Sequence, residues 1–141
     1  MSANVTSNAA DEAAIRGVLS AYQDALNASN TEAVMPLYTE DGVFMPPNNQ
    51  SAVGKAAVRQ AYDAVFKAIT LNVKFHIAEL VTMSPEWAFV RTNSAGTNKN
   101  NASGAVVAEG NQELFIFNKG SGGKWQIARY SFSTTNPLPG G

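Results

Sequence analysis

The clearest pattern in the chain is an alternation of apolar and polar residues through its second half. Two such runs, Val106 to Lys119 and Lys124 to Thr134, flank the glycine-rich segment Gly120 to Gly123. A period of two with aromatic and β-branched residues predicts a β-hairpin, and the glycines supply its turn. Two earlier runs, Leu71 to Thr82 and Trp87 to Thr97, predict two more strands. Because both faces of the C-terminal hairpin are largely apolar, both faces must be covered.

The first half of the chain has a helical period instead. Apolar residues recur at spacings of three and four from Asp11 to Asn27, and the same spacing returns from Lys55 to Ile69. A shorter helix is expected from Thr31 to Leu37. Between these helices, Val43 to Met45 predicts a brief strand that the prolines Pro46 and Pro47 end.

These elements predict a single domain of the α+β class, with helices first and long antiparallel strands after them. A length of 141 residues suits one domain with a substantial core. We expect residues 1–9 to form a flexible tail, residues 10–135 the domain, and residues 136–141 a second flexible tail.

Composition excludes several classes of function. The net charge is −1 and the basic residues are scattered, so we expect no nucleic-acid partner. The absence of cysteine excludes disulfides, and a single histidine excludes a multi-histidine metal site within one chain, so no metal and no cofactor are expected. No apolar run reaches the roughly 20 residues of a membrane span, and no signal segment is visible, so we expect no membrane partner and a cytoplasmic location.

Five segments, taken in their order along the chain, resemble one superfamily. These segments are Tyr38 to Pro47, Gly54-Lys55, Phe89 to Thr97, Asn111 to Phe115, and Trp125 to Phe132. Together they resemble the NTF2-like superfamily, which includes the SnoaL-like polyketide cyclases and ketosteroid isomerase. The resemblance is closer to the DUF4440 and SgcJ/EcaC-type branch of that superfamily.

The resemblance implies a cystatin-like cone, in which three N-terminal helices pack on a strongly bent, mostly antiparallel sheet. A pocket then opens at the wide end, and a homodimer forms through the outer face of the sheet. An apolar outer face agrees with such a dimer, because soluble monomers rarely expose large apolar patches. The resemblance does not fix one activity, since this fold hosts isomerases, cyclases, dehydratases, hydrolases and non-catalytic binders.

The strand turns allow the register of the sheet to be estimated. If Phe117 lies opposite Trp125, then Glu113 lies opposite Arg129, and if Phe115 lies near Phe89, Glu113 also neighbours Arg91. The estimate predicts a row of alternating charge across four strands, consisting of Glu79, Arg91, Glu113 and Arg129. Two interpretations stay open: a structural ladder of ion pairs, or a pocket floor on which an arginine binds an anionic or enolate oxygen and Glu113 acts as a base.

Three residues are candidates for acid–base catalysis: Glu113, His76 and Tyr22. His76 is the one side chain whose unperturbed pKa lies near neutrality, although a lone strand histidine more often has only a structural role. Tyr22 approximately matches the position of a first-helix tyrosine that forms an oxyanion hole in ketosteroid isomerase-like proteins, and core packing is its alternative role. The candidate ligand-binding residues are Tyr38, Phe44, Arg91, Thr92, Arg129 and Tyr130.

Two functions remain open at this point. The first is binding of a small hydrophobic or polyketide-like metabolite with cofactor-independent acid–base chemistry of the isomerase or cyclase type. The second is a non-catalytic, dimeric ligand-binding or accessory protein. They differ in whether the cavity contains an ionisable group matched to a hydrogen-bond donor about 3 Å from a common point.

Overall fold

The structure, a computed structural model, describes residues 2–136. The helices are α1 (Ser2–Asn27), α2 (Thr31–Val34), the 3₁₀ helix η1 (Met35–Leu37) and α3 (Lys55–Ala68). The strands are β1 (Tyr38–Met45), β2 (Ala52–Val53), β3 (Ile69–Thr82), β4 (Trp87–Asn100), β5 (Val106–Lys119) and β6 (Trp125–Thr134). The α+β class expected from the sequence is confirmed, whereas β2 was not predicted and β1 begins at Tyr38 instead of Val43.

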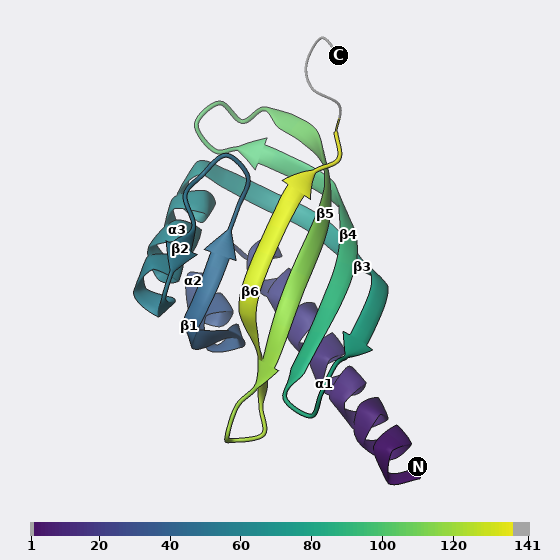
Figure 1. The fold of residues 1–141 in the computed structure, drawn as a ribbon. Coiled ribbons are helices and arrows are strands. Elements are labelled where there is room, and N and C mark those ends of the chain that lie inside the picture. Colours follow the sequence, from purple (N-terminus) through teal and green to yellow (C-terminus); the bar gives the residue numbers. More distant parts are fainter. Residues whose placement is uncertain (1, 137–141) are drawn as a thin grey trace.

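The six strands form one sheet in the order β2-β1-β6-β5-β4-β3. Every neighbouring pair is antiparallel except β1 and β6, which are parallel. Figure 1 shows the sheet curling, with α1 running behind the long strands and α3 beside β1 and β2. The core therefore lies on the concave face of the sheet, under the helices.

Helix α1 begins at Ser2, so residues expected to form a flexible tail are helical instead. The C-terminal tail expected at residues 136–141 lies outside the described residues, apart from Asn136.

Two amide side chains attach α1 to the edge of the sheet. The Asn27 side chain accepts from the Val73 backbone N–H at 2.8 Å and donates to the Val73 carbonyl at 2.9 Å, as a neighbouring strand would. One turn earlier, the Gln23 side chain accepts from the Phe75 N–H at 2.8 Å. Because β3 is an edge strand, these bonds satisfy backbone groups that the sheet itself leaves unpaired.

Two features shape the curl of the sheet. Gly96 lies opposite Val73, and a Cβ atom at Gly96 would lie only 1.9 Å from the Asn72 carbonyl oxygen, so only glycine permits this approach of β3 and β4. In addition, Ala78 in β3 and Ala128 in β6 each have no partner in the neighbouring strand, which makes each a β-bulge. A bulge bends its strand and increases the local twist.

The observed register contradicts part of the predicted charge row. Arg91 does pair with Glu79, but Glu113 lies opposite Thr92 on β4 and opposite Phe132 on β6, and not beside Arg91 or Arg129. The pairing of β4 with β5 differs by one residue from the estimate, and such a slip moves a side chain to the other face of the sheet. Glu113 consequently lies on the concave face.

Among residues 2–136, no helix combines the length and the apolar character that a membrane span requires.

Candidate functional site

A cavity of about 310 Å³ opens between the concave face of the sheet and helices α1 and α3. Tyr22 and Leu26 contribute to it from α1, and Tyr62 and Val65 from α3. Most of the remaining wall comes from the loop after β1 and from β3 to β6. The lining is mainly apolar, with a few polar side chains gathered on β4 and β5, which is the usual make-up of a small-molecule pocket.

Glu113 is the most deeply buried carboxylate that faces this cavity, with a relative exposure of 5%. Its two oxygens accept hydrogen bonds from neutral groups, Oε1 from the Thr92 hydroxyl at 2.5 Å and Oε2 from the Ser94 hydroxyl at 2.5 Å. Burial raises the pKa of Glu113, while these two hydrogen bonds partly offset the increase. A carboxylate in this environment is a stronger base than one in water.

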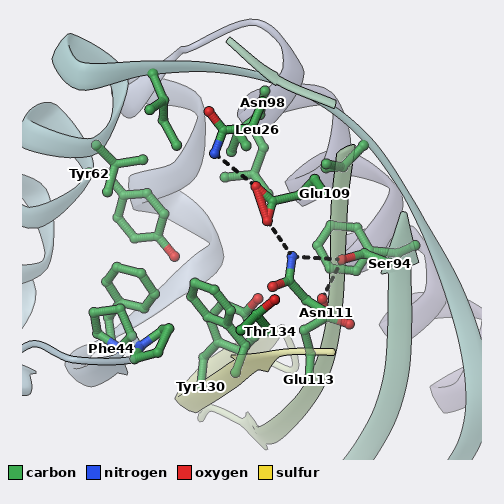
Figure 2. Close-up of a pocket in the computed structure, with 18 of the residues that line it drawn as sticks. Leu26, Phe44, Tyr62, Ser94, Asn98, Glu109, Asn111, Glu113, Tyr130 and Thr134 are labelled. Carbon is green, nitrogen blue, oxygen red and sulfur yellow. Dashed lines mark hydrogen bonds between the residues drawn. The ribbon is translucent and has the colours of Figure 1, made fainter. Parts of the chain in front are cut away.

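The hydrogen bonds continue from Glu113 along the wall of the cavity, as Figure 2 shows. The Asn111 amide donates to Ser94 Oγ at 3.4 Å and to Glu109 Oε2 at 3.0 Å. The Asn98 amide donates to the other oxygen of Glu109 at 3.0 Å. Glu109 and Glu113 are therefore linked by neutral side chains, and the charge of Glu109 contributes to the raised pKa of Glu113.

A chain of tyrosine hydroxyls lies on the other side of the cavity. Tyr62 Oη is 2.6 Å from Tyr22 Oη and 2.7 Å from Tyr38 Oη. Burial raises the pKa of all three phenols, so they stay neutral donors. The Tyr130 hydroxyl also bonds to Tyr22, so four hydroxyls share three hydrogen bonds and one of their four protons remains for a further acceptor.

Aromatic rings form the floor between these polar groups. Phe44 stacks on Tyr62 with ring centroids 4.6 Å apart, and on Tyr130 with centroids 5.7 Å apart. Tyr130 in turn stacks on Phe115 at 4.1 Å. Each ring is held by its neighbours, so this part of the cavity is a preformed apolar wall.

The structure brings six of the nine candidate residues to this region and places three elsewhere. Tyr22, Phe44, Glu113 and Tyr130 line the cavity, while Thr92 and Tyr38 support it through hydrogen bonds. His76, Arg91 and Arg129 are exposed on the convex face. Arg91 pairs with Glu79 at 2.6 Å, and Arg129 donates to the Asp41 carbonyl at 3.0 Å. No arginine therefore contacts Glu113, contrary to the predicted charge row.

Sequence reasoning missed the polar partners in the site. Tyr62, Ser94, Glu109 and Asn111 are not among the candidate residues. One signal was present in the sequence: Glu109, Asn111 and Glu113 are spaced by two and therefore share one face of a strand.

Within residues 2–136, no cluster of three or more His, Cys, Asp or Glu side chains has a geometry that could hold a metal ion.

Comparison with known proteins places this geometry in a family. The model of the SnoaL-like domain matches residues 19–129. A ketosteroid isomerase-like protein from Erwinia carotovora atroseptica SCRI1043 is 40% identical, with 89% of this chain and 96% of that chain covered and a TM-score of 0.85. No curated protein matches the chain significantly.

More distant solved structures share the fold alone. A candidate scytalone dehydratase from Novosphingobium aromaticivorans DSM 12444 is 19% identical over 94% of this chain and 89% of that one, with a TM-score of 0.80. An NTF2-like protein with a cystatin-like fold from the same species is 19% identical over 96% and 89%, with a TM-score of 0.73. With the match to most of its length, this chain belongs to the SnoaL-like domain family, and it shares the cystatin-like fold of the more distant structure.

Proposed function

We propose that the cavity binds a small hydrophobic metabolite and that Glu113 acts on it as a general base, without a cofactor. The observation that carries this proposal is a buried carboxylate that faces an apolar cavity and has only neutral hydrogen-bond donors as partners. A structural ion pair would lower the pKa of Glu113, whereas burial raises it here. General bases work best when their pKa lies close to the working pH.

The proposed reaction is proton transfer next to a carbonyl group. The Glu113 carboxylate removes a proton from the carbon beside the carbonyl, and the electron pair of that C–H bond moves toward the carbonyl oxygen to give an enolate. The spare phenol proton of the tyrosine chain stabilises the oxygen as its charge develops. Protonated Glu113 then returns the proton to another carbon, which completes an isomerisation with no net change in atoms.

The proximity of the Glu113 carboxylate to the tyrosine hydroxyls supports this assignment. Burial is the main cause of the raised pKa of Tyr22 and of Tyr130, and the negative charge of Glu113 adds to both increases, so the carboxylate lies within electrostatic reach of these phenols. An oxyanion that formed between them would have the base on one side and a donor on the other. The name of the relative from Erwinia, a ketosteroid isomerase-like protein, agrees with this chemistry.

The test is isomerisation of cyclic β,γ-unsaturated ketones, followed by the ultraviolet absorbance of the conjugated product. We expect activity in the wild type and a loss of about 10²–10⁴-fold in Glu113→Gln, since this is the usual contribution of a general base. Glu86→Gln, at an exposed position in the β3–β4 turn, is the matched control. Ketone binding without turnover in the wild type would support a non-catalytic ligand-binding protein instead.

Two finer assignments accompany this proposal. The sequence motifs favour the DUF4440 and SgcJ/EcaC-type branch of the family, and the exposed apolar residues Val81, Trp87 and Leu114 of the convex face favour a homodimer through that face. The cytoplasmic location stays a prediction from the sequence.

A further inference from the structure

The wall formed by β4 and β5 uses most of its hydrogen-bond donors internally. Both N–H groups of the Asn111 amide are engaged, one with Ser94 and one with Glu109. The Thr92 and Ser94 hydroxyls donate to Glu113. The groups that remain for a ligand on this wall are mainly acceptors, namely the free lone pairs of the two carboxylates and the Asn111 carbonyl oxygen.

Charge on the cavity lining is of one sign. Two glutamates, Glu109 and Glu113, line the cavity, whereas no Lys, Arg or His side chain of the described chain does so. The partners of Glu109 are the neutral amides of Asn98 and Asn111. A carboxylate held only by neutral groups keeps its charge uncompensated, so an anionic ligand is repelled here and a cationic one is attracted.

The opposite side of the cavity has the complementary character. The stacked rings of Phe44 and Tyr62 provide an apolar surface, and the tyrosine chain has one spare hydroxyl proton. Figure 2 shows Tyr62 and Phe44 on one side of the space, facing Glu109 and Asn111 on the other. One side of the cavity therefore has apolar aromatic rings and a hydroxyl donor. The other side has hydrogen-bond acceptors, two of which are negatively charged carboxylates.

We propose that the ligand is a hydrophobic molecule with a protonated amine, and that Glu109 binds this ammonium group while Asn111 accepts from one of its N–H groups. The proposal rests on the proposed function, in that it takes the cavity to be the small-molecule site. It assigns Glu109 to ligand recognition and leaves Glu113 as the base. Three ammonium N–H donors match the surplus of acceptors on this wall.

The test uses three probes of similar size and different charge: 2-(2-naphthyl)ethylamine, 2-ethylnaphthalene and 3-(2-naphthyl)propionate. Binding to the wild-type protein is measured by titration at pH 7. A hydrogen bond between charged groups contributes enough free energy for roughly a tenfold or larger preference, so we expect the amine to bind at least tenfold more tightly than the hydrocarbon. The carboxylate should bind most weakly.

Glu109→Gln keeps the size of the side chain and removes its charge. We expect this variant to lose the preference for the amine while it binds 2-ethylnaphthalene as the wild type does, which also shows that it is folded. Glu86→Gln, whose substituted side chain is exposed in the β3–β4 turn, should keep the preference.

The outcomes separate this inference from the proposed function. Equal binding of the three probes, or tighter binding of the carboxylate, would overturn the ammonium inference and leave the cavity as a small-molecule site. Loss of the preference in Glu113→Gln but not in Glu109→Gln would overturn the assignment to Glu109. Binding of none of the probes would overturn the ammonium inference, while the ketone assay decides the proposed function separately.

Discussion

Thr92 and Glu113 lie directly opposite each other on β4 and β5, and the Thr92 hydroxyl donates to Glu113 Oε1 at 2.5 Å. The Ser94 hydroxyl does the same for Oε2. Two neutral donors hold the carboxylate in one orientation without supplying a positive charge. The energetic balance between burial and these two hydrogen bonds sets the proton affinity of Glu113, and each part of that balance can be changed by substitution.

The Ser94 hydroxyl lowers the pKa of Glu113, so its removal should raise that pKa further. We expect Ser94→Ala to titrate Glu113 at higher pH than the wild type does, because the ionised carboxylate loses one donor while burial continues to disfavour its charge. The measurement is the ¹³C chemical shift of the glutamate carboxyl carbons as a function of pH, with the Glu113 signal assigned from Glu113→Gln.

Ser133→Ala is the matched control for that experiment. Ser133 lies on β6 and accepts from the Gln112 amide at 3.1 Å, without contact to Glu113. An unchanged pKa in Ser94→Ala, or an equal shift in Ser133→Ala, would contradict the role assigned to Ser94.

Protein stability should depend on pH through Glu113. Its folded pKa is raised, so the folded state binds the proton more tightly than the unfolded chain, in which a glutamate has a pKa of about 4.3. The resulting stability is fully present below that unfolded pKa and is lost as the pH rises through the folded pKa. The glutamine side chain of Glu113→Gln carries no charge at any pH, so the free energy of unfolding of this variant should decrease less as the pH rises above about 4.3, the unfolded value.

Urea denaturation of the wild type and Glu113→Gln at several pH values in that window measures this difference. Glu86→Gln, an exposed substitution, should follow the wild type. Parallel curves for the wild type and Glu113→Gln would mean that burial does not raise the pKa of Glu113.

Tyr62 occupies the middle of the tyrosine chain, and Tyr38 occupies one end. Tyr62→Phe removes both hydrogen bonds and leaves two buried hydroxyls without that partner, whereas Tyr38→Phe removes one. We expect destabilisation of about 1–3 kcal/mol for each hydroxyl left unpaired, so the loss should be larger in Tyr62→Phe. Chemical denaturation of both variants gives the comparison, and equal losses would contradict the central position of Tyr62.

The convex face of the sheet should determine the oligomeric state. Leu114 is 43% exposed there, beside Arg91 of the neighbouring strand. If two copies meet through this face, Leu114→Lys buries a charge in an apolar contact and should shift the mass measured by light scattering from two chains toward one. Val107→Lys, at an exposed apolar position at the beginning of β5, should keep the larger mass. A wild type of single-chain mass at micromolar concentration would remove the dimer from consideration.

Much of the fold follows from local patterns. Strands β3 and β4 and the final hairpin of β5 and β6 lie close to the expected positions, because alternation of polar and apolar residues and the glycine-rich turn specify them directly. The pairing of Glu79 with Arg91 was also predicted, since a short turn joins their strands. Contacts between strands that a short turn connects can therefore be predicted from the sequence.

The composition of the site was harder to predict, for a specific physical reason. The estimated register paired Phe115 with Phe89, whereas Phe115 lies opposite Val90. An error of one residue in the pairing places a side chain on the wrong face of the sheet. The bulge at Ala128 reverses the alternation within β6, so Ile127 is buried while Arg129 is exposed. Neither the one-residue difference in register nor the bulge can be recognised from the local sequence pattern. For this reason an arginine was expected beside Glu113.

Because α1 both lines the cavity and covers the edge of β3, the shape of the cavity and the protection of that edge depend on the same helix. The same helix that contributes Tyr22 and Leu26 to the cavity also supplies Gln23 and Asn27, whose amides occupy the backbone groups of Val73 and Phe75. If this helix detached, the binding site would open at the same moment as an unpaired strand edge became available to other chains. Occupation of the cavity by a ligand would hold the helix in place and so protect the protein against aggregation as well.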